Sequence, residues 1–156
     1  MRKQKGFSLI ELLIVVAIIL IIAAIAIPNL LRSRMAANEA SAVGSVRSIN
    51  TAQVTYASTY PAIGFAGLTS LGGAGGTSTS AGLIDTVLAC AAPPCIKSGY
   101  QFNSVAAGGP PATTYDTHGD PVTPGQTGQR HFFSDQSGVI RYNTSAAATS
   151  TDAPLQ

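Results

Sequence analysis

The chain has 156 residues, of which 46% are hydrophobic and 10% are charged, and it contains two cysteines. Three of its nine Lys and Arg side chains lie within the first five residues, so the remainder carries six basic against seven acidic side chains. That balance gives no support for nucleic-acid binding through net charge. The sequence also lacks a nucleophile elbow, a His-Glu-x-x-His motif and a phosphate-binding glycine pattern. We therefore predict that the chain is not an enzyme and has no cofactor.

The first predicted element is an apolar run from Phe7 to Ile27, interrupted by a single charge at Glu11. As a helix its 21 residues would extend ~31 Å, about the thickness of the hydrocarbon core of a bilayer. Arg2, Lys3 and Lys5 precede the run, and basic residues beside a spanning segment favour the cytoplasmic side. We therefore expect a membrane-spanning helix whose N-terminus faces the cytoplasm and whose following residues face outward.

Two simpler interpretations of this run are a cleaved secretory signal and a plain membrane anchor. Ala24 and Ala26 supply the small residues of a signal-peptidase site, but the apolar region of such a signal usually has only about 7 to 15 residues. A plain anchor does not explain Glu11, because a carboxylate in hydrocarbon costs several kcal/mol and usually marks a functional partner. Both interpretations are disfavoured for these reasons.

The start of the run reads Lys5-Gly6-Phe7-Ser8-Leu9-Ile10-Glu11-Leu12. This segment resembles the class III signal of the type IV pilins and the related pseudopilins. The resemblance implies that a membrane prepilin peptidase cleaves after Gly6, before the apolar helix, and methylates the new N-terminal residue, Phe7. It is close over about the first 60 residues and includes Pro28, which falls where type IV pilins usually carry a helix-interrupting proline.

Glu11 acquires a role if the processed chain keeps its apolar helix. Such a subunit can leave the bilayer only if other helices of the same kind replace the lipid around it, so extraction requires polymerisation. In the packed core of a filament, the carboxylate of Glu11 needs a cation, and the amino group of a neighbouring subunit's Phe7 is a suitable one. Breaking a buried pair of this kind costs about 3 to 5 kcal/mol, because it leaves a charge unpaired.

Residues 29–60 are predicted to continue the helix as an amphipathic half. Pro61 should end it, because proline disfavours helical geometry in the residue before it. Pro28 lies inside the whole element, where it either kinks the helix or marks a boundary at the membrane surface. The polar side is expected to carry Arg32, Arg34, Glu39 and Arg47. The face expected to pack on a globular domain consists of Met35, Ala42, Ile49 and Tyr56 with the neighbouring stripe of Val46, Gln53 and Tyr60.

The remainder, residues 61–156, is predicted to be a small globular head with an antiparallel sheet. Pro61 to Gly82 is rich in glycine and hydroxyl side chains and should form a loop that builds no core. Leu83 to Ala89 is expected to form a short helix, and the tail from Ser145 to Gln156 is expected to be poorly ordered. Strands are predicted at Tyr100 to Val105, Arg130 to Ser134 and Val139 to Tyr142, the last two joined by the turn Asp135-Gln136-Ser137-Gly138.

These elements predict an α+β fold in which one long N-terminal helix packs on a small antiparallel sheet, the arrangement of the pilin fold. The expected divisions are a cleaved leader (1–6), a transmembrane and filament-core helix (7–28), the amphipathic half of the helix (29–60) and the head (61–156). A head of this size buries a limited core. Its stability should therefore depend on the helix and on any cross-link.

Cys90 and Cys95 are expected to form a disulfide, because an even cysteine count in an exported segment favours oxidation. A zinc site would need further soft ligands, and the chain offers only His118 and His131. Asp116, His118 and Asp120 form the only local ionisable cluster, and a calcium site there would need about six to eight oxygens. We therefore predict no metal site and a solvated role for the three side chains.

The function predicted from these features is that of a structural subunit of a type IV pilus. The resemblance implies four kinds of partner, namely copies of the chain itself, a prepilin peptidase, an assembly ATPase with its membrane platform, and an outer-membrane secretin. It also implies location in the inner membrane before assembly and in an extracellular filament afterwards. Two alternatives are a pseudopilin of a type II secretion system and a membrane-tethered binding domain that does not polymerise.

Overall fold

The computed structural model describes residues 6–155, so the predicted leader residues Arg2, Lys3 and Lys5 lie outside the described part. The described chain forms two compact units that meet in sequence at Arg34 and Met35. One helix, α1, contributes to both. The elements are α1 (Leu9–Thr59), α2 (Leu68–Leu71), β1 (Cys95–Lys97), β2 (Tyr100–Ala107), β3 (Thr114–Pro121), β4 (His131–Asp135) and β5 (Ile140–Asn143).

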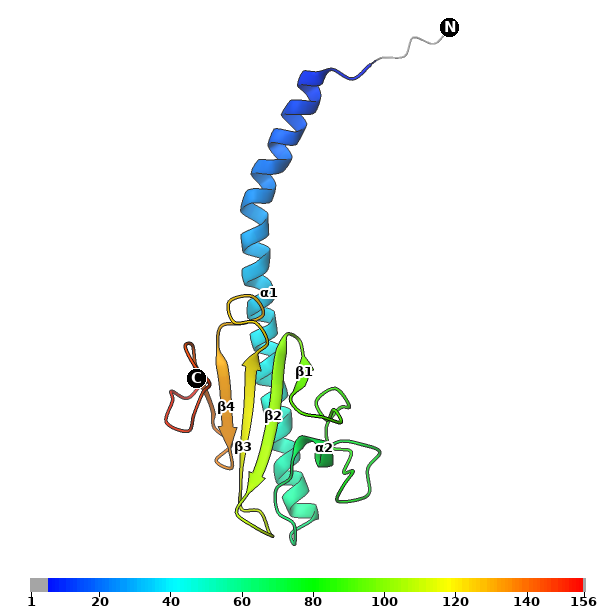
Figure 1. Ribbon diagram of the computed structural model, residues 1–156, viewed down its shortest axis with the longest axis vertical. Coiled ribbons are helices and arrows are strands. Elements are labelled where there is room, and N and C mark those ends of the chain that lie inside the picture. Colours follow the sequence, from blue (N-terminus) through cyan, green and yellow to red (C-terminus); the bar gives the residue numbers. More distant parts are fainter. Residues whose placement is uncertain (1–5, 156) are drawn as a thin grey trace. The chain divides into compact units, whose positions relative to one another are not determined.

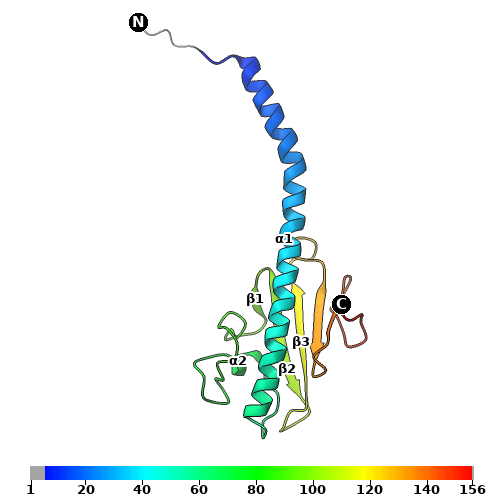
Figure 2. The ribbon, with the colours of Figure 1, turned by 180° about the vertical axis from the view of Figure 1, so that it is seen from behind.

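The second half of α1 packs on one face of the sheet (Figures 1 and 2). Val46, Ile49, Gln53 and Tyr56 are almost fully buried there, which confirms the predicted packing face. Opposite them, the sheet contributes the buried aromatic side chains of Tyr100, Phe102, Tyr115 and Phe132. Each large apolar side chain buried in this way stabilises the fold by about 1.5 to 3 kcal/mol. The α+β arrangement of a long helix on an antiparallel sheet is confirmed.

The sheet is an antiparallel meander in the order β1-β2-β3-β4-β5. Two of its strands, β1 and β3, were not expected from the sequence. Strand β3 carries polar residues at its outward positions and glycine at one inward position, so its hydrophobic alternation is weak. A Cβ atom at Gly119 would lie 3.1 Å from the ring of Phe102, so glycine lets this ring pack closely on the strand. Eight residue pairs nevertheless join β3 to β2 in continuous register.

The predicted hairpin between β4 and β5 has the expected turn. The amide of Gly138 donates to the carbonyl of Asp135 at 2.9 Å, and the Oδ1 atom of Asp135 accepts from the amide of Ser137 at 2.9 Å. Gly138 has φ of 73°, a left-handed conformation that glycine adopts without a Cβ penalty. The turn chemistry therefore fixes the register of these two strands.

The glycine-rich connection after α1 contributes more to the core than the sequence suggests. Leu68 and Leu71, in α2, are fully buried, so the prediction that Pro61 to Gly82 builds no core is wrong. The helix predicted at Leu83 to Ala89 is also wrong. This segment forms a single turn, in which the Oδ1 atom of Asp85 accepts the amides of Val87 and Leu88.

The C-terminal tail lies along the outer edge of β5, so the prediction that it is poorly ordered is wrong for residues 145–155. Tyr142 donates its amide to Ala153 at 3.1 Å, and Leu155 donates its amide to Ile140 at 2.7 Å. The side chain of Asp152 accepts the amide of Thr149 at 2.7 Å. Backbone pairing of this kind depends little on which side chains carry it, which is why composition missed it.

Candidate assembly segment

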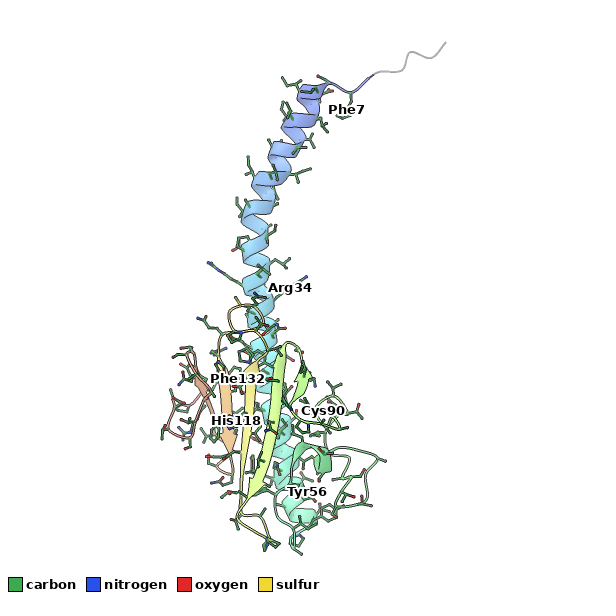
Figure 3. All side chains as sticks on the ribbon, in the orientation of Figure 1. Phe7, Arg34, Tyr56, Cys90, His118 and Phe132 are labelled. Carbon is green, nitrogen blue, oxygen red and sulfur yellow. A yellow bond between two sulfur atoms is a disulfide. The ribbon has the colours of Figure 1, made fainter. Side chains whose placement is uncertain are left out.

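The first described residues lead directly into α1. Gly6, Phe7 and Ser8 are exposed and have no helical or strand assignment, and α1 begins at Leu9 (Figure 3). The amide of Ser8 donates to the Oε2 atom of Glu11 at 2.9 Å, while Leu12 donates its amide to the carbonyl of Ser8. This is one half of a capping box, in which an acid three residues into the helix binds a free amide at its start.

Glu11 is thus attached to the helix terminus by a local hydrogen bond. This capping role was not predicted beside the assembly role of Glu11, although the spacing Ser8-x-x-Glu11 is the signal for it. No ion pair reaches Glu11 from residues 6–155. Its negative charge therefore has no cationic partner within the part of the chain that the structure describes.

The apolar part of α1 has the length and composition to cross a membrane. Its most apolar window of 18 residues has a mean hydropathy of 3.3, and none of that window is buried. Phe7, just before the helix, is 81% exposed. An apolar surface of this extent is stable only against lipid or against other protein surfaces. Pro28 lies inside α1 and removes one backbone hydrogen bond from the helix there.

The two cysteines lie in the head, far along the chain from this segment. Cys90 and Cys95 form a disulfide with a Cα–Cα distance of 5.5 Å, and neither cysteine is free. Cys95 starts β1 and is buried, whereas Cys90 follows the turn that contains the buried Leu88. The bond therefore ties the long connection after α1 to the edge strand of the sheet.

The ionisable cluster singled out from the sequence lies along β3. Asp116, His118 and Asp120 alternate with buried residues and so share the outward face of the sheet. Asp116 pairs in register with Asp135 on β4, and Asp120 binds the Nδ1 atom of His131 at 2.7 Å. Within residues 6–155, no group of three or more His, Cys, Asp or Glu side chains converges as a metal site would require.

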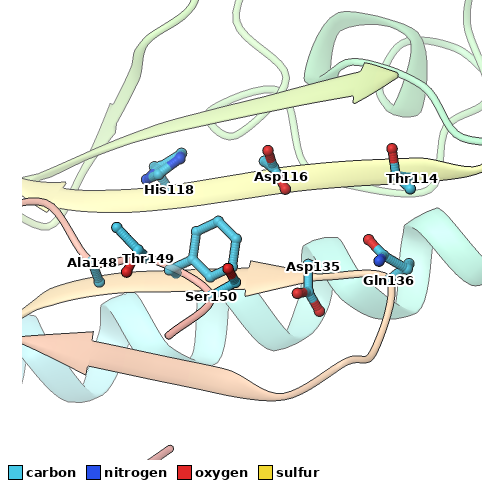
Figure 4. Close-up of a pocket in the computed structure, with 9 residues that line it drawn as sticks. Thr114, Asp116, His118, Asp135, Gln136, Ala148, Thr149 and Ser150 are labelled. Carbon is cyan, nitrogen blue, oxygen red and sulfur yellow. The ribbon is translucent and has the colours of Figure 1, made fainter. Parts of the chain in front are cut away.

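A hollow of about 460 Å³ opens on this outward face beside the tail. Figure 4 shows His118, Asp116 and Thr114 following one another along β3, with Asp135 and Gln136 at the end of β4. The ring of His118 packs edge-on against Phe133, with ring centroids 5.2 Å apart. The arrangement provides hydrogen-bonding groups on a packed floor, with no nucleophile held by a base. The remaining lining residues are Phe133, Ala148, Thr149 and Ser150.

Glu39 was predicted on the solvated side of α1, and this prediction is wrong. Its carboxylate accepts the amides of Gln129 and Arg130 at 2.8 and 3.2 Å and binds the Nε atom of Arg130 at 2.7 Å. Partial burial alone would raise the pKa of Glu39, but these hydrogen bonds and the positive charge of Arg130 outweigh it, so the pKa is lowered. Helical periodicity cannot reveal such a contact, since its partner is 91 residues away.

Comparison with known proteins agrees with the N-terminal pattern. Residues 1–27 match the family described as the prokaryotic N-terminal methylation motif. The type IV wide pilus major component PilA4 of Thermus thermophilus is 67% identical over 39 residues, which cover 25% of this chain and 30% of that protein. The type IV major pilin protein PilA of Myxococcus xanthus is 44% identical over 54 residues, covering 35% of this chain and 24% of that protein.

A third similar protein belongs to a secretion system. The type II secretion system core protein G of Vibrio cholerae is 39% identical over 56 residues, covering 36% of this chain and 38% of that protein. The matches therefore span between 24% and 38% of the length of these curated relatives. No solved structure matches the chain. The family match lies in the N-terminal segment, at residues 1–27.

Proposed function

We propose that the chain is a structural subunit of a type IV pilus, because it carries the N-terminal methylation motif and is similar to type IV pilins and a secretion-system core protein. Its work is assembly rather than catalysis. After processing, the subunit is held in the membrane by the first half of α1. It then polymerises with copies of itself through that same half, while the head faces outward.

The observation that carries this proposal is the contrast between the apolar half of α1 and its single carboxylate. Within residues 6–155, none of the apolar window is buried and Glu11 has no cationic partner. A packed bundle of such helices covers the apolar surface. It also brings the amino terminus of one subunit close to the carboxylate of another. Assembly thus covers the apolar surface and gives the carboxylate of Glu11 a cationic partner.

The proposed processing fits the local backbone. The peptide bond between Gly6 and Phe7 lies two residues before α1, in a segment without helical structure. Proteases bind extended backbone, so this bond is accessible without unwinding the helix. Cleavage there creates a free amine at Phe7, next to Ser8, whose amide already binds the carboxylate of Glu11 at 2.9 Å. We propose that this amine is methylated and pairs with Glu11 of a neighbouring subunit.

We propose the partners and locations that the resemblance to type IV pilins implies. A prepilin peptidase in the inner membrane removes residues 1–6, and an assembly ATPase drives extraction through a membrane platform. The filament then crosses the outer membrane through a secretin. The subunit is thus an inner-membrane protein before assembly and part of an extracellular filament afterwards.

Mass spectrometry of the N-terminal peptide tests the proposal. Surface material is sheared from the cells, and the membranes of the same cells are washed. The proteins of both fractions are then digested to peptides without reduction of the disulfide. N-methylated Phe7 abundant in the sheared fraction is the expected result. A peptide that begins at Ile27, or an uncut Met1 in both fractions, would overturn the processing and with it the proposed function.

The second candidate function is that of a pseudopilin in a type II secretion system. The identity of 39% to core protein G over 56 residues favours it. Methylated Phe7 confined to the membrane fraction, with none in the sheared material, would support this candidate over a pilus. A tethered domain that does not polymerise is the remaining alternative, and it predicts an unmethylated N-terminus.

A further inference from the structure

The head contacts α1 through polar groups at the point where the helix first becomes buried. We name this region the collar. It consists of Asn38, Glu39 and Ser41 on α1, the turn at Ser98 and Gly99 between β1 and β2, and residues 123–130 between β3 and β4. Figure 1 shows both connections beside α1 at the same end of the sheet.

The collar is held by five hydrogen bonds from one helical turn. Glu39 accepts three of them, from Gln129 and Arg130. Asn38 donates its Nδ2 hydrogen to the carbonyl of Thr127 at 2.9 Å, and Ser41 bonds the hydroxyl of Ser98 at 3.0 Å. The two connections are also linked to each other, because Val122 donates its amide to the carbonyl of Gly99 at 3.0 Å.

The loop that faces Glu39 is also held by contacts with the strands of the head. Gly128 lies against the ring of Tyr100, in a space that any Cβ atom would fill. The Tyr100 hydroxyl donates to the carbonyl of Arg130 at 2.8 Å. The guanidinium of Arg130 lies 5.6 Å from the ring centre of Phe132 and 5.7 Å from that of Tyr142. The groups that bind Glu39 are therefore also held by residues outside α1, which lowers the entropy lost in the contact.

Burial of apolar side chains begins further along α1 than the polar contacts of the collar do. The first buried positions on the helix are Ala42 and Val43, whereas Ala40 is exposed. The contacts of Asn38 and Glu39 extend the held part of the helix outward by about one turn. Further toward the N-terminus, Pro28 weakens the helix by removing a backbone hydrogen bond. The collar thus lies between a weak point of α1 and its buried half.

We infer that the collar sets the boundary on α1 between a half held by the head and a half free to bend or unwind, with Glu39 as the positioning residue. In a filament, which rests on the proposed function, this boundary limits how far a distortion that starts at Pro28 can travel. The collar then keeps the head folded while the filament bends.

Hydrogen exchange on the mature chain in detergent micelles tests the inference without requiring a filament. Amides of α1 residues 39–43 are compared between the wild type and Glu39→Ala. Hydrogen bonds to a charged group are strong enough that we expect exchange there to accelerate by about tenfold to a hundredfold. Amides of residues 49–56, deeper in the head, should keep their protection.

Two further variants make the test decisive. Asn38→Ala, which removes one hydrogen bond, should accelerate the same amides by a smaller factor, and it serves in place of Glu39→Ala if that variant does not fold. Asp85→Ala removes the ion pair with Lys97, which does not involve α1, and should leave residues 39–43 unchanged. Unchanged exchange at 39–43 in Glu39→Ala, or equal acceleration along the whole of residues 39–56, overturns the inference. Because micelles contain no filament, failure of the proposed function would leave this result intact.

Discussion

The two halves of α1 belong to one continuous helix but differ in where their apolar side chains are buried. In the second half, Val46 and Ile49 are fully buried against the sheet. In the first half, none of the most apolar window is buried against the residues that the structure describes. The second half is therefore stabilised by its own head, whereas the first half depends on lipid or on other subunits.

Polar side chains show the same difference. Gln53 and Glu39, on the second half, have hydrogen-bonding partners within the chain. Glu11, on the first half, binds only the local amide of Ser8 among the described residues. A buried polar group needs a partner. The second half finds its partners in the head, and the proposed function would supply those of the first half from neighbouring subunits. Substitutions in the second half should therefore change the free energy of unfolding of the head, and substitutions in the first half should change the yield of filaments.

Removing the charge of Glu11 should have the largest effect. Glu11→Gln keeps the acceptor that caps the helix at Ser8 but loses the negative charge, whereas Glu11→Ala loses both. If an unpaired amine in the filament core costs about 3 to 5 kcal/mol, each subunit addition weakens by at least about a hundredfold. We expect no sheared filaments from either variant, measured as pilin released from the cell surface.

The membrane fraction provides the control for the Glu11 variants. Both should be present there at the wild-type level, and the free energy of unfolding of the head should not change. Normal filament yield from Glu11→Gln would show that the charge is not needed. If Glu11→Ala loses its filaments and Glu11→Gln keeps them, Glu11 would act in assembly through helix capping and not through charge pairing.

Gln53 provides the matching test in the second half of the helix. It donates to the carbonyl of Ala66 at 2.6 Å and to the hydroxyl of Ser104 at 3.1 Å, and it accepts the amide of Ala66. Gln53→Leu keeps the volume but leaves these buried groups unpaired. We expect the head to lose about 3 kcal/mol of stability, measured by chemical unfolding of the mature chain in micelles. Ser48→Ala, an exposed position on the same helix, should change it by less than about 0.5 kcal/mol.

The sequence predicts best the features that depend on neighbouring residues. The limits of α1, the buried stripe at Ile49 and Tyr56, and the turn before Gly138 follow from local periodicity and turn chemistry. The segment around Glu11 was recognised for the same reason, since its motif is contiguous.

What the sequence did not predict depends on partners that are distant in the chain. Strand β3 has no apolar alternation of its own, and its place follows from the register with β2. Glu39 appears solvated until the loop at Arg130 is placed against it. The tail is ordered by backbone hydrogen bonds to β5, and the side chain of Asn143 on β5 donates to the carboxylate of Asp152. In each case the decisive contact is tertiary, and single-sequence patterns do not encode it.

The disulfide should have an intermediate effect, confined to the head. Cys90 and Cys95 are five residues apart, and closing so short a loop stabilises the fold by about 2 kcal/mol in the chain-entropy account. We expect the double variant with Ala at both positions to lose about that amount in chemical unfolding. Reductant should lower the stability of the wild type by a similar amount and leave the double variant unchanged. Sensitivity of the double variant to reductant would contradict the assignment.

The smallest effect should come from pH acting on Glu39. Hydrogen bonds from the amides of Gln129 and Arg130 and the charge of Arg130 lower the folded pKa of Glu39 below its ordinary value. The folded pKa is depressed, so the carboxylate stabilises the head above the unfolded pKa, which is about 4.3. This contribution is lost as pH falls through the folded pKa. Tyr100 also faces this cluster and has its pKa raised, first by burial and then by Glu39, so it stays neutral throughout that range.

Comparing wild type with Glu39→Gln over a range of pH isolates this contribution. After allowance for solvent screening, we expect the wild type to be more stable by about 1 kcal/mol at pH 7. The gap should narrow as the pH falls through the lowered folded pKa of Glu39, because the protonated carboxyl is neutral like the amide of Gln. Asp116→Asn, an exposed carboxylate on the opposite face of the sheet, should change stability by less than about 0.5 kcal/mol at any pH in this range. A gap that stays the same at every pH down to the acid unfolding of the head would mean that Glu39 acts through shape and packing, and the charge of its carboxylate would then not be what holds the head to α1.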